Sequence, residues 1–405
     1  TDPIPGLITR LAIPASVGMF FYTMFNVVDT YFAGHSSTDA VAALSLSFPV
    51  FFIVIAVGSG LSTATTALVG TALGGDNKEE AQRFGLQSIG VGAIAAVLLG
   101  ALGIAVSPFL FRHLGASDTY LKLCMDYMSV IFYGAPLFML VYVFNGVLNA
   151  VGDTKSHRNF LILGFFLNCL LDPWFVRGGL GLPPMGVAGI GLATVIVQAV
   201  GAVYLGYKLG KSGVLKPVSL AALVPRLGTV REIIAQWLPS SINYLTIGIG
   251  IFVITWFISR FGKEAVAAYG IATRVEQIVL MPTVGINVAV MSLTAQNRGA
   301  MLGNRVRETR RTALQYGFWI MLLGSALVFF LRETMMGLFT EDREVIAIGA
   351  HYLGISAFCL YAYVVLFVDV AVLQGLKRPM FGVWIGLFRQ ILAPVAVFWY
   401  FTVEN

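Results

Sequence analysis

Four polar residues at helical spacing lie inside apolar stretches of the sequence. Asn26 and Asp29 are separated by two valines, and Asn168 and Asp172 by Cys-Leu-Leu. Spacings of three and four residues place both members of each pair on one face of a helix. A charged group inside a bilayer is costly, so carboxylates in such stretches are candidates for a functional site.

The chemistry expected of this pair is reversible cation binding. Two close carboxyl groups in a medium of low dielectric constant cannot both ionise comfortably, so one of them is expected to hold a proton. The same carboxylate and amide oxygens also suit Na⁺, and the sequence leaves both ions open. The alternative to a cation site is that each acid lies at a helix end in contact with interfacial water, because Asp172 precedes Pro173 and Asp29 lies five residues before Gly34.

A second set of charged residues falls in apolar stretches nearer the C-terminus, namely Arg274, Glu276, Asp369 and Arg389. Their balanced signs predict a buried ion-pair cluster. Such a cluster either holds helices together or takes part in gating or binding, and the residues alone favour neither role.

The elements that position these residues must be membrane-spanning helices. Of the 405 residues, 58% are apolar and 11% are charged, and the mean hydropathy is +0.83. A soluble domain carries about 25% charged residues, so the outer surface of this chain must face lipid. The net charge of +6 comes from basic residues in short loops, which is a topology signal and no sign of nucleic-acid binding.

Apolar runs long enough to cross a bilayer recur along the whole chain. We expect eleven, at about 9–34, 41–73, 84–111, 119–150, 157–176, 186–208, 232–261, 265–297, 311–332, 345–375 and 380–402. Most of the basic residues fall on the side of the membrane that holds the N-terminus, which predicts a cytoplasmic N-terminus. Pro14 removes a backbone hydrogen bond from the first run and predicts a kink there.

An internal repeat relates the two halves of the chain. A shift of 225 residues aligns Pro14 with Pro239 and Asp39-Ala-Val-Ala-Ala with Glu264-Ala-Val-Ala-Ala. Ile254 stands at the equivalent of Asp29, so the first acidic pocket is not duplicated. With six spans per copy, both copies enter from the same side and are parallel repeats about an axis along the membrane normal.

The predicted fold class is therefore an all-α polytopic membrane protein built from two parallel six-helix repeats. We expect a twelfth span beyond Asn405, because the second copy stops where the first still has one span to come. The expected domains are an N-terminal lobe, a cytoplasmic linker and a C-terminal lobe, at 1–208, 209–230 and 231–405.

The sequence carries no motif for an enzyme. It holds no Walker A sequence, no HExxH and no catalytic GxSxG turn, so we expect neither ATP nor a metal cofactor. The function expected is secondary transport in a cytoplasmic (inner) membrane, with H⁺ or Na⁺ as the coupling ion. A passive channel fits less well, because an acidic pocket in one half suits alternating access better than a symmetric pore.

Several segments together resemble the multidrug and toxic compound extrusion (MATE) transporters. They are Pro14 and Asp29 in the first span, Asn168-x-x-x-Asp172 in the fifth, and the segments 148–155, 295–300 and 373–379 that follow spans. The resemblance covers essentially the whole chain. It implies a V-shaped pair of six-helix lobes that exports small amphipathic, often cationic and aromatic drugs by H⁺ or Na⁺ antiport, from a protein expected to be monomeric.

The resemblance also implies roles for individual residues. The DinF-like prokaryotic branch keeps its cation site in the N-terminal lobe, which matches Asp29, Asn168 and Asp172, and Thr194 is similar to its sixth-span ligand. Asn145 in the fourth span is expected to line the substrate cavity. Asp369 resembles the tenth-span acid of the other branch, which leaves a second coupling site open. The alternative function is a flippase for lipids or lipid-linked saccharides.

Overall fold

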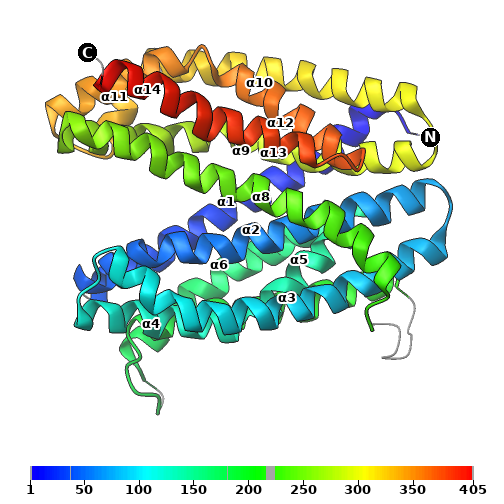
Figure 1. The fold of residues 1–405 in the computed structure, drawn as a ribbon, viewed down its shortest axis with the longest axis horizontal. Coiled ribbons are helices and arrows are strands. Elements are labelled where there is room, and N and C mark those ends of the chain that lie inside the picture. The colour runs from blue at the N-terminus through cyan, green and yellow to red at the C-terminus, as the bar shows by residue number, and fades with distance from the viewer. Residues whose placement is uncertain (1, 37, 180, 216–223, 404–405) are drawn as a thin grey trace.

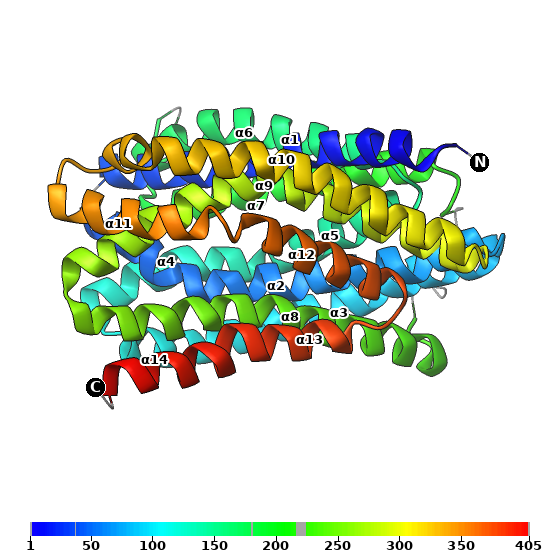
Figure 2. The same ribbon diagram turned by 90° about the horizontal axis from the view of Figure 1, so that it is seen from above.

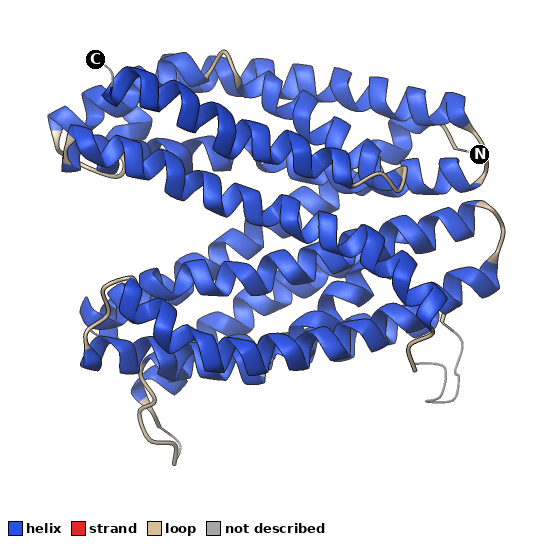
Figure 3. Ribbon diagram, in the orientation of Figure 1, coloured by secondary structure: helices blue, strands red, loops and turns tan. Residues whose placement is uncertain are grey.

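Long helices make up nearly all of the computed structural model, which describes residues 2–36, 38–179, 181–215 and 224–403. Figure 3 shows helices joined by short loops, and within the described residues the strand-like pairing is a single bridge between Gly179 and Leu182. The first half contains α1 (Ile4–Ser36), α2 (Thr38–Gly74), α3 (Lys78–His113), α4 (Asp118–Tyr133), α5 (Ala135–Ala150), α6 (Thr154–Arg177) and α7 (Val187–Lys211). The second contains α8 (Leu227–Ile258), α9 (Lys263–Gly299), α10 (Gly303–Gly337), α11 (Arg343–Ser356), α12 (Leu360–Gly375), α13 (Met380–Leu387) and α14 (Ala393–Val403).

The helices fit the predicted number of spans. Among the described residues, nine segments are long and apolar enough to cross a membrane, and two bent helix pairs bring the number to as many as eleven. The all-helical polytopic fold is thus confirmed. Several helices exceed the bilayer thickness, because the 37 residues of α2 extend for about 55 Å against about 30 Å of hydrocarbon.

Two of the predicted spans, 119–150 and 345–375, are each formed by a bent pair of helices. The pair α4 and α5 is bent by 51° at Gly134, and the pair α11 and α12 by 57°. Pro136 lies in the first turn of α5, where its missing N–H is tolerated, so it favours a new helix start. The second break has no proline, but the Ser325 hydroxyl donates to the carbonyl of Ala357 at 2.6 Å and stabilises it.

The helices form two halves that Figure 1 shows side by side, one from α1 to α7 and the other from α8 to α14; Figure 2 shows the same helices from above. We call them the N-half and the C-half. The predicted linker lies between α7 and α8, and its residues 216–223 fall outside the described part of the chain. Its end is fixed to the N-half, because the Gln87 amide donates to Val224 O and accepts from Arg226 N at 2.7 and 2.6 Å.

The interface between the halves has an approximate two-fold symmetry. Helix α1 packs on α9 while its repeat equivalent α8 packs on α2, the equivalent of α9. Glycines permit this packing in equivalent pairs: a methyl group on Gly60 would overlap Ser241, and one on Gly285 would overlap Ser16. These partners are related by the same shift of 225 residues as the sequence repeat.

The halves are in closest contact at the end that carries the N-terminus, which we call the closed end. There Gly74 lies against the carbonyl of Gln296, and Gly299 lies against the carbonyl of Thr71. Two hydrogen bonds also cross the interface: Ser292 Oγ donates to Asn149 O at 2.5 Å, and Gln296 Nε2 donates to Ala150 O at 2.6 Å. The ribbons of the two halves diverge towards the other end (Figure 1).

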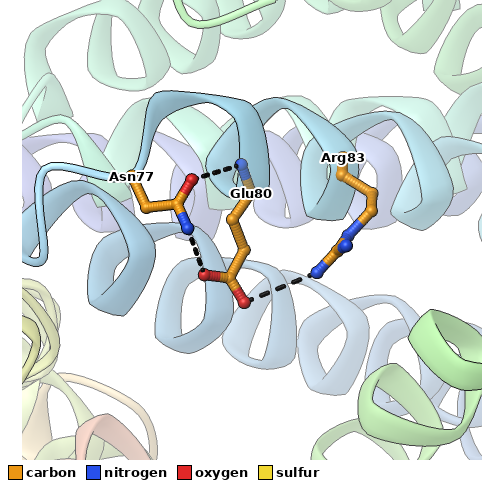
Figure 4. Close-up of polar contacts among 3 residues, drawn as sticks. All are labelled: Asn77, Glu80 and Arg83. Carbon is orange, nitrogen blue, oxygen red and sulfur yellow. Dashed lines mark hydrogen bonds and ion pairs between the residues drawn. The ribbon is translucent and has the colours of Figure 1, made fainter.

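The turn between α2 and α3 at the closed end is fixed by a reciprocal cap (Figure 4). Asn77 Oδ1 accepts from the backbone N–H of Glu80, and Asn77 Nδ2 donates to Glu80 Oε2, both at 3.0 Å. Arg83 lies 3.5 Å from the other oxygen of Glu80. The cap satisfies a backbone N–H group that the first turn of a helix leaves without a partner. It also places the carboxylate of Glu80 at the N-terminus of α3, where the helix dipole is positive.

Candidate functional site

The two acids predicted in the N-half lie together between α1 and α6. Asn168 on α6 joins them, because its Nδ2 donates to Asp29 Oδ1 at 2.6 Å and to Asp172 Oδ2 at 3.0 Å. Both carboxyl groups thus lie within hydrogen-bond distance of the same amide nitrogen. Helices α1 and α6 pack along their length, and the spacing of four residues turns Asn168 and Asp172 to the same side of α6.

This cluster is shut off from solvent. Asp29 is 7% exposed, and Asn168 and Asp172 are fully buried. Within the described residues, Asp172 Oδ1 and Asn168 Oδ1 have no hydrogen-bond partner, and no basic side chain forms an ion pair with either acid. Two buried carboxylates without positive charge would be very costly, so the site requires a proton or a small cation.

The other two residues predicted for this site, Asn26 and Thr194, lie in the N-half but donate their hydrogen bonds to groups outside the acid pair. The Asn26 amide donates to Tyr22 O at 2.8 Å, and the Thr194 hydroxyl donates to Ile190 O at 3.1 Å. Each bond stays within its own helix, α1 or α7. In the described structure, neither residue has a hydrogen bond to Asp29.

Two tyrosines that the sequence analysis missed lie close to the acids. Tyr127 on α4 is buried within Coulombic range of Asp29 and Asp172, and Tyr22 on α1 lies within that range of Asp29. Tyr22 precedes Asp29 by seven residues and so lies on the same helix face, which is the signal that could have identified it. Tyr127 could have been found from the repeat, where it aligns with Tyr352.

Asn145 is the predicted cavity-lining residue in the N-half. It lies on α5, is half-buried, and its Oδ1 has no hydrogen-bond partner among the described residues. A buried amide oxygen without a donor is costly, so this group is available to a hydrogen-bond donor.

Pro14 lies on α1 where the two halves touch. Atoms of the neighbouring residues Ala12 and Ser16 face Gly285 of α9, and Ser16 Oγ donates a hydrogen bond to Pro282 O at 3.4 Å. Helix α1 continues through Pro14 without interruption. A bend at this proline would therefore change the contact between the halves.

The charged set predicted in the C-half is not held together by direct ion pairs in the described structure. Within the described residues, Arg274, Glu276, Asp369 and Arg389 form no ion pair with one another. Arg274 and Glu276 are two residues apart and so point to different sides of α9, where Arg274 is exposed and Glu276 is buried.

Each member of that set has a different neighbour. Asp369 on α12 accepts two hydrogen bonds from the guanidinium of Arg310 on α10. Glu276 is 6% exposed and accepts from the Tyr352 hydroxyl at 3.3 Å, while its Oε1 has no hydrogen-bond partner in the described structure. Arg389 lies over the ring of Tyr363 at 4.8 Å.

Comparison with known proteins identifies the relatives of this chain. The sequence model of the MatE family matches residues 14–174 and 239–399, two segments displaced by 225 residues. The chain is 27% identical over 398 residues to an FAD transporter of Shewanella oneidensis, covering 96% of this chain and 86% of that protein. It is 28% identical over 350 residues to a probable multidrug resistance protein NorM of Thermotoga maritima, covering 84% and 73%.

The fold is also that of solved transporters. A structure described as the outward-facing conformation of a multidrug resistance MATE family transporter of the MOP superfamily superposes with a TM-score of 0.89. The two are 25% identical in sequence, and the match covers 96% of this chain and 87% of that one. The match therefore includes both halves of this chain.

Proposed function

The chain belongs to the MatE family of membrane transporters, and from this premise we propose that it is a proton-coupled exporter of small amphipathic, often cationic and aromatic compounds. We further propose that it uses the DinF-like arrangement, with the coupling site in the N-half. It is a transporter and not an enzyme.

The observation that carries this proposal is the buried acid pair Asp29 and Asp172, joined by Asn168. Its negative charge has no basic partner in the described structure, so its protonation changes the local electrostatics strongly. Residues in such a position inside a membrane protein serve ion pathways and proton relays.

Helix α1 is the element that links this site to the two halves. Asp29 on its outer part faces α6 of the N-half, and the segment around Pro14 faces α9 of the C-half. We propose that protonation of the pair permits α1 to bend near Pro14, which changes the contact with α9 and displaces the exported compound. Substrate and proton then compete for the N-half, which makes the exchange obligatory.

In this proposal the proton gradient supplies the free energy for the cycle. Each pH unit contributes about 1.4 kcal/mol per proton. Each 100 mV of membrane potential adds about 2.3 kcal/mol per charge. The positive-inside pattern puts the closed end in the cytoplasm, so the arrangement described above corresponds to the outward-facing state.

The experiment is transport of ethidium, a fluorescent cationic dye, into inverted membrane vesicles under an imposed pH gradient and, separately, a Na⁺ gradient. The proposal predicts uptake that needs the pH gradient. Asp29→Asn is expected to reduce the initial rate at least about ten-fold, the effect of roughly 1.4 kcal/mol in coupling.

The matched control is Asp126→Asn, which removes an acid from α4 that has no hydrogen bond to the pair in the described structure. It should transport at nearly the normal rate. Uptake driven only by Na⁺ would identify the other coupling ion. Normal uptake by Asp29→Asn would overturn the coupling role of the N-half.

A flavin dinucleotide is a second candidate substrate, because the relative from Shewanella oneidensis that matches 96% of this chain is an FAD transporter. The same vesicles should therefore be tested with FAD, whose isoalloxazine fluorescence reports uptake. The flippase alternative predicts that neither ethidium nor FAD is transported and that a lipid-linked saccharide is.

A further inference from the structure

A groove on the C-half lies between α10 and α12, away from the acid pair. It has a volume of about 870 Å³, which is within the range of ligand sites, and its lining divides into a basic part and an aromatic part. The lining residues are Arg310, Arg311, Leu314, Gln315, Tyr316, Phe318, Trp319 and Tyr361. Helix α10 is a membrane-spanning segment at the edge of the bundle in Figure 1, and its Phe318 and Trp319 are exposed, so we take this side of α10 to face the membrane.

The basic part of the groove is held in place by Asp369. This acid accepts from Nε and Nη2 of Arg310, so the guanidinium is fixed while the N–H groups of Nη1 point elsewhere. Arg311 is exposed and forms no ion pair in the described part of the chain. Asp369 neutralises the charge of Arg310, while the charge of Arg311 is not compensated. The groove therefore carries a net positive charge.

The aromatic part lies deeper in the membrane. Helix α10 begins at Gly303 at the closed end, and Trp319 follows Arg311 by eight residues, or about 12 Å along the helix. Trp319 is 65% exposed, and Phe318 beside it packs edge-to-face on Tyr361 of α12 at 5.4 Å. The sequence predicted the hydrocarbon segment of this span at 311–332, so Arg311 lies at its boundary.

We propose that this groove binds one anionic phospholipid from the leaflet at the closed end. The phosphate contacts Arg310 and Arg311, whose planar guanidinium groups match phosphate oxygens. An acyl chain lies along Leu314, Phe318 and Trp319. A basic pocket between helices on the cytoplasmic side is the site that anionic lipid headgroups prefer.

The proposal gives Asp369 a function different from ion coupling. Its carboxylate orients Arg310 and so acts as a positioning residue for the lipid phosphate. The lipid would also contact both α10 and α12, and therefore stabilise the second part of the broken span α11–α12 against its neighbour.

The test is native mass spectrometry of the intact purified protein in detergent with phosphatidylglycerol or phosphatidylcholine added. The protein is expected to retain one phosphatidylglycerol in preference to phosphatidylcholine. Arg311→Gln should weaken that binding about five-fold, the effect of one basic side chain at an anionic surface. Arg231→Gln is the matched control, because Arg231 is exposed near the start of α8 at the same end and lies outside the groove.

A second measurement locates the lipid in the groove. Its background replaces by Phe the other exposed tryptophans, Trp174, Trp256, Trp384 and Trp399. In this background, phosphatidylglycerol with brominated acyl chains should quench the fluorescence of Trp319 at low lipid ratios, and Trp319→Phe should remove most of that quenching. Asp369→Glu keeps the charge but moves the carboxylate that orients Arg310, so it should weaken binding while Arg310 is retained. Equal retention of the two lipids, or equal effects of Arg311→Gln and Arg231→Gln, would overturn the proposal, and both measurements are independent of transport.

Discussion

The two hydrogen bonds across the closed end should set how often that end opens. Ser292 and Gln296 of α9 donate to Asn149 O and Ala150 O at the end of α5. Ser292 is fully buried and Gln296 half-buried, so water replaces these donors poorly. The double variant Ser292→Ala/Gln296→Ala loses about 1 kcal/mol for each bond, or about 2 kcal/mol in total. That shifts the equilibrium about 30-fold towards opening of the closed end.

The assay is double electron–electron resonance between spin labels on cysteines placed at positions 79 and 304, in a background without Cys124, Cys169 and Cys359. These positions are exposed, and they lie at the starts of α3 and α10, one in each half. The variant should show a new population at longer distances, where the parent shows one short distance.

Thr294→Val is the matched control for this prediction. Thr294 lies between the two donors on α9, is buried, and its hydroxyl has no hydrogen-bond partner among the described residues. Its replacement should leave the distance distribution unchanged. The reasoning is refuted if the double variant also keeps the parent distribution, or if Thr294→Val opens the closed end equally.

Two further predictions concern packing and charge in the C-half. Gly299→Ala places a methyl group against the backbone carbonyl of Thr71, so it should lower the free energy of unfolding by about 1–3 kcal/mol. The control is Gly303→Ala, which has no atom within 4 Å of the added methyl group and should leave the stability unchanged. Equal melting temperatures of the two variants would contradict the close approach of the halves. Glu276→Gln should melt within about 2 °C of the parent, because the amide can still accept from Tyr352 and no ion pair is lost, and a large loss of stability would show that this carboxyl is charged and paired.

The sequence was sufficient to predict the spans and the N-half acids, because both depend on local patterns. Long apolar runs identify membrane helices, and the spacing between Asn168 and Asp172 determines that they share a face. That Asp29 meets them could be proposed only as a possibility, since it depends on which helices are neighbours. The structure brings α1 and α6 together, and this contact has no signature in a single sequence.

The breaks at Gly134 and after Ser356 could not be predicted from hydropathy. A run of apolar residues gives the same signal whether it is straight or bent, and the break after Ser356 depends on a hydrogen bond from Ser325 on another helix. The pair between Asp369 and Arg310 was missed for a related reason. The predicted span began only at residue 311, whereas α10 begins at Gly303 and carries Arg310 opposite α12.

The two-fold packing of the halves has a consequence for the origin of this protein. Equivalent glycines at 60 and 285, and at 74 and 299, make the same contacts in both directions. An interface of this kind is what a homodimer of a six-helix ancestor would have used, where each mutation counted twice. Within one chain the two copies can differ at equivalent positions, and here the first copy has Asp29 where the second has Ile254. Specialisation of one lobe therefore requires that the two copies are encoded separately, as they are in this chain.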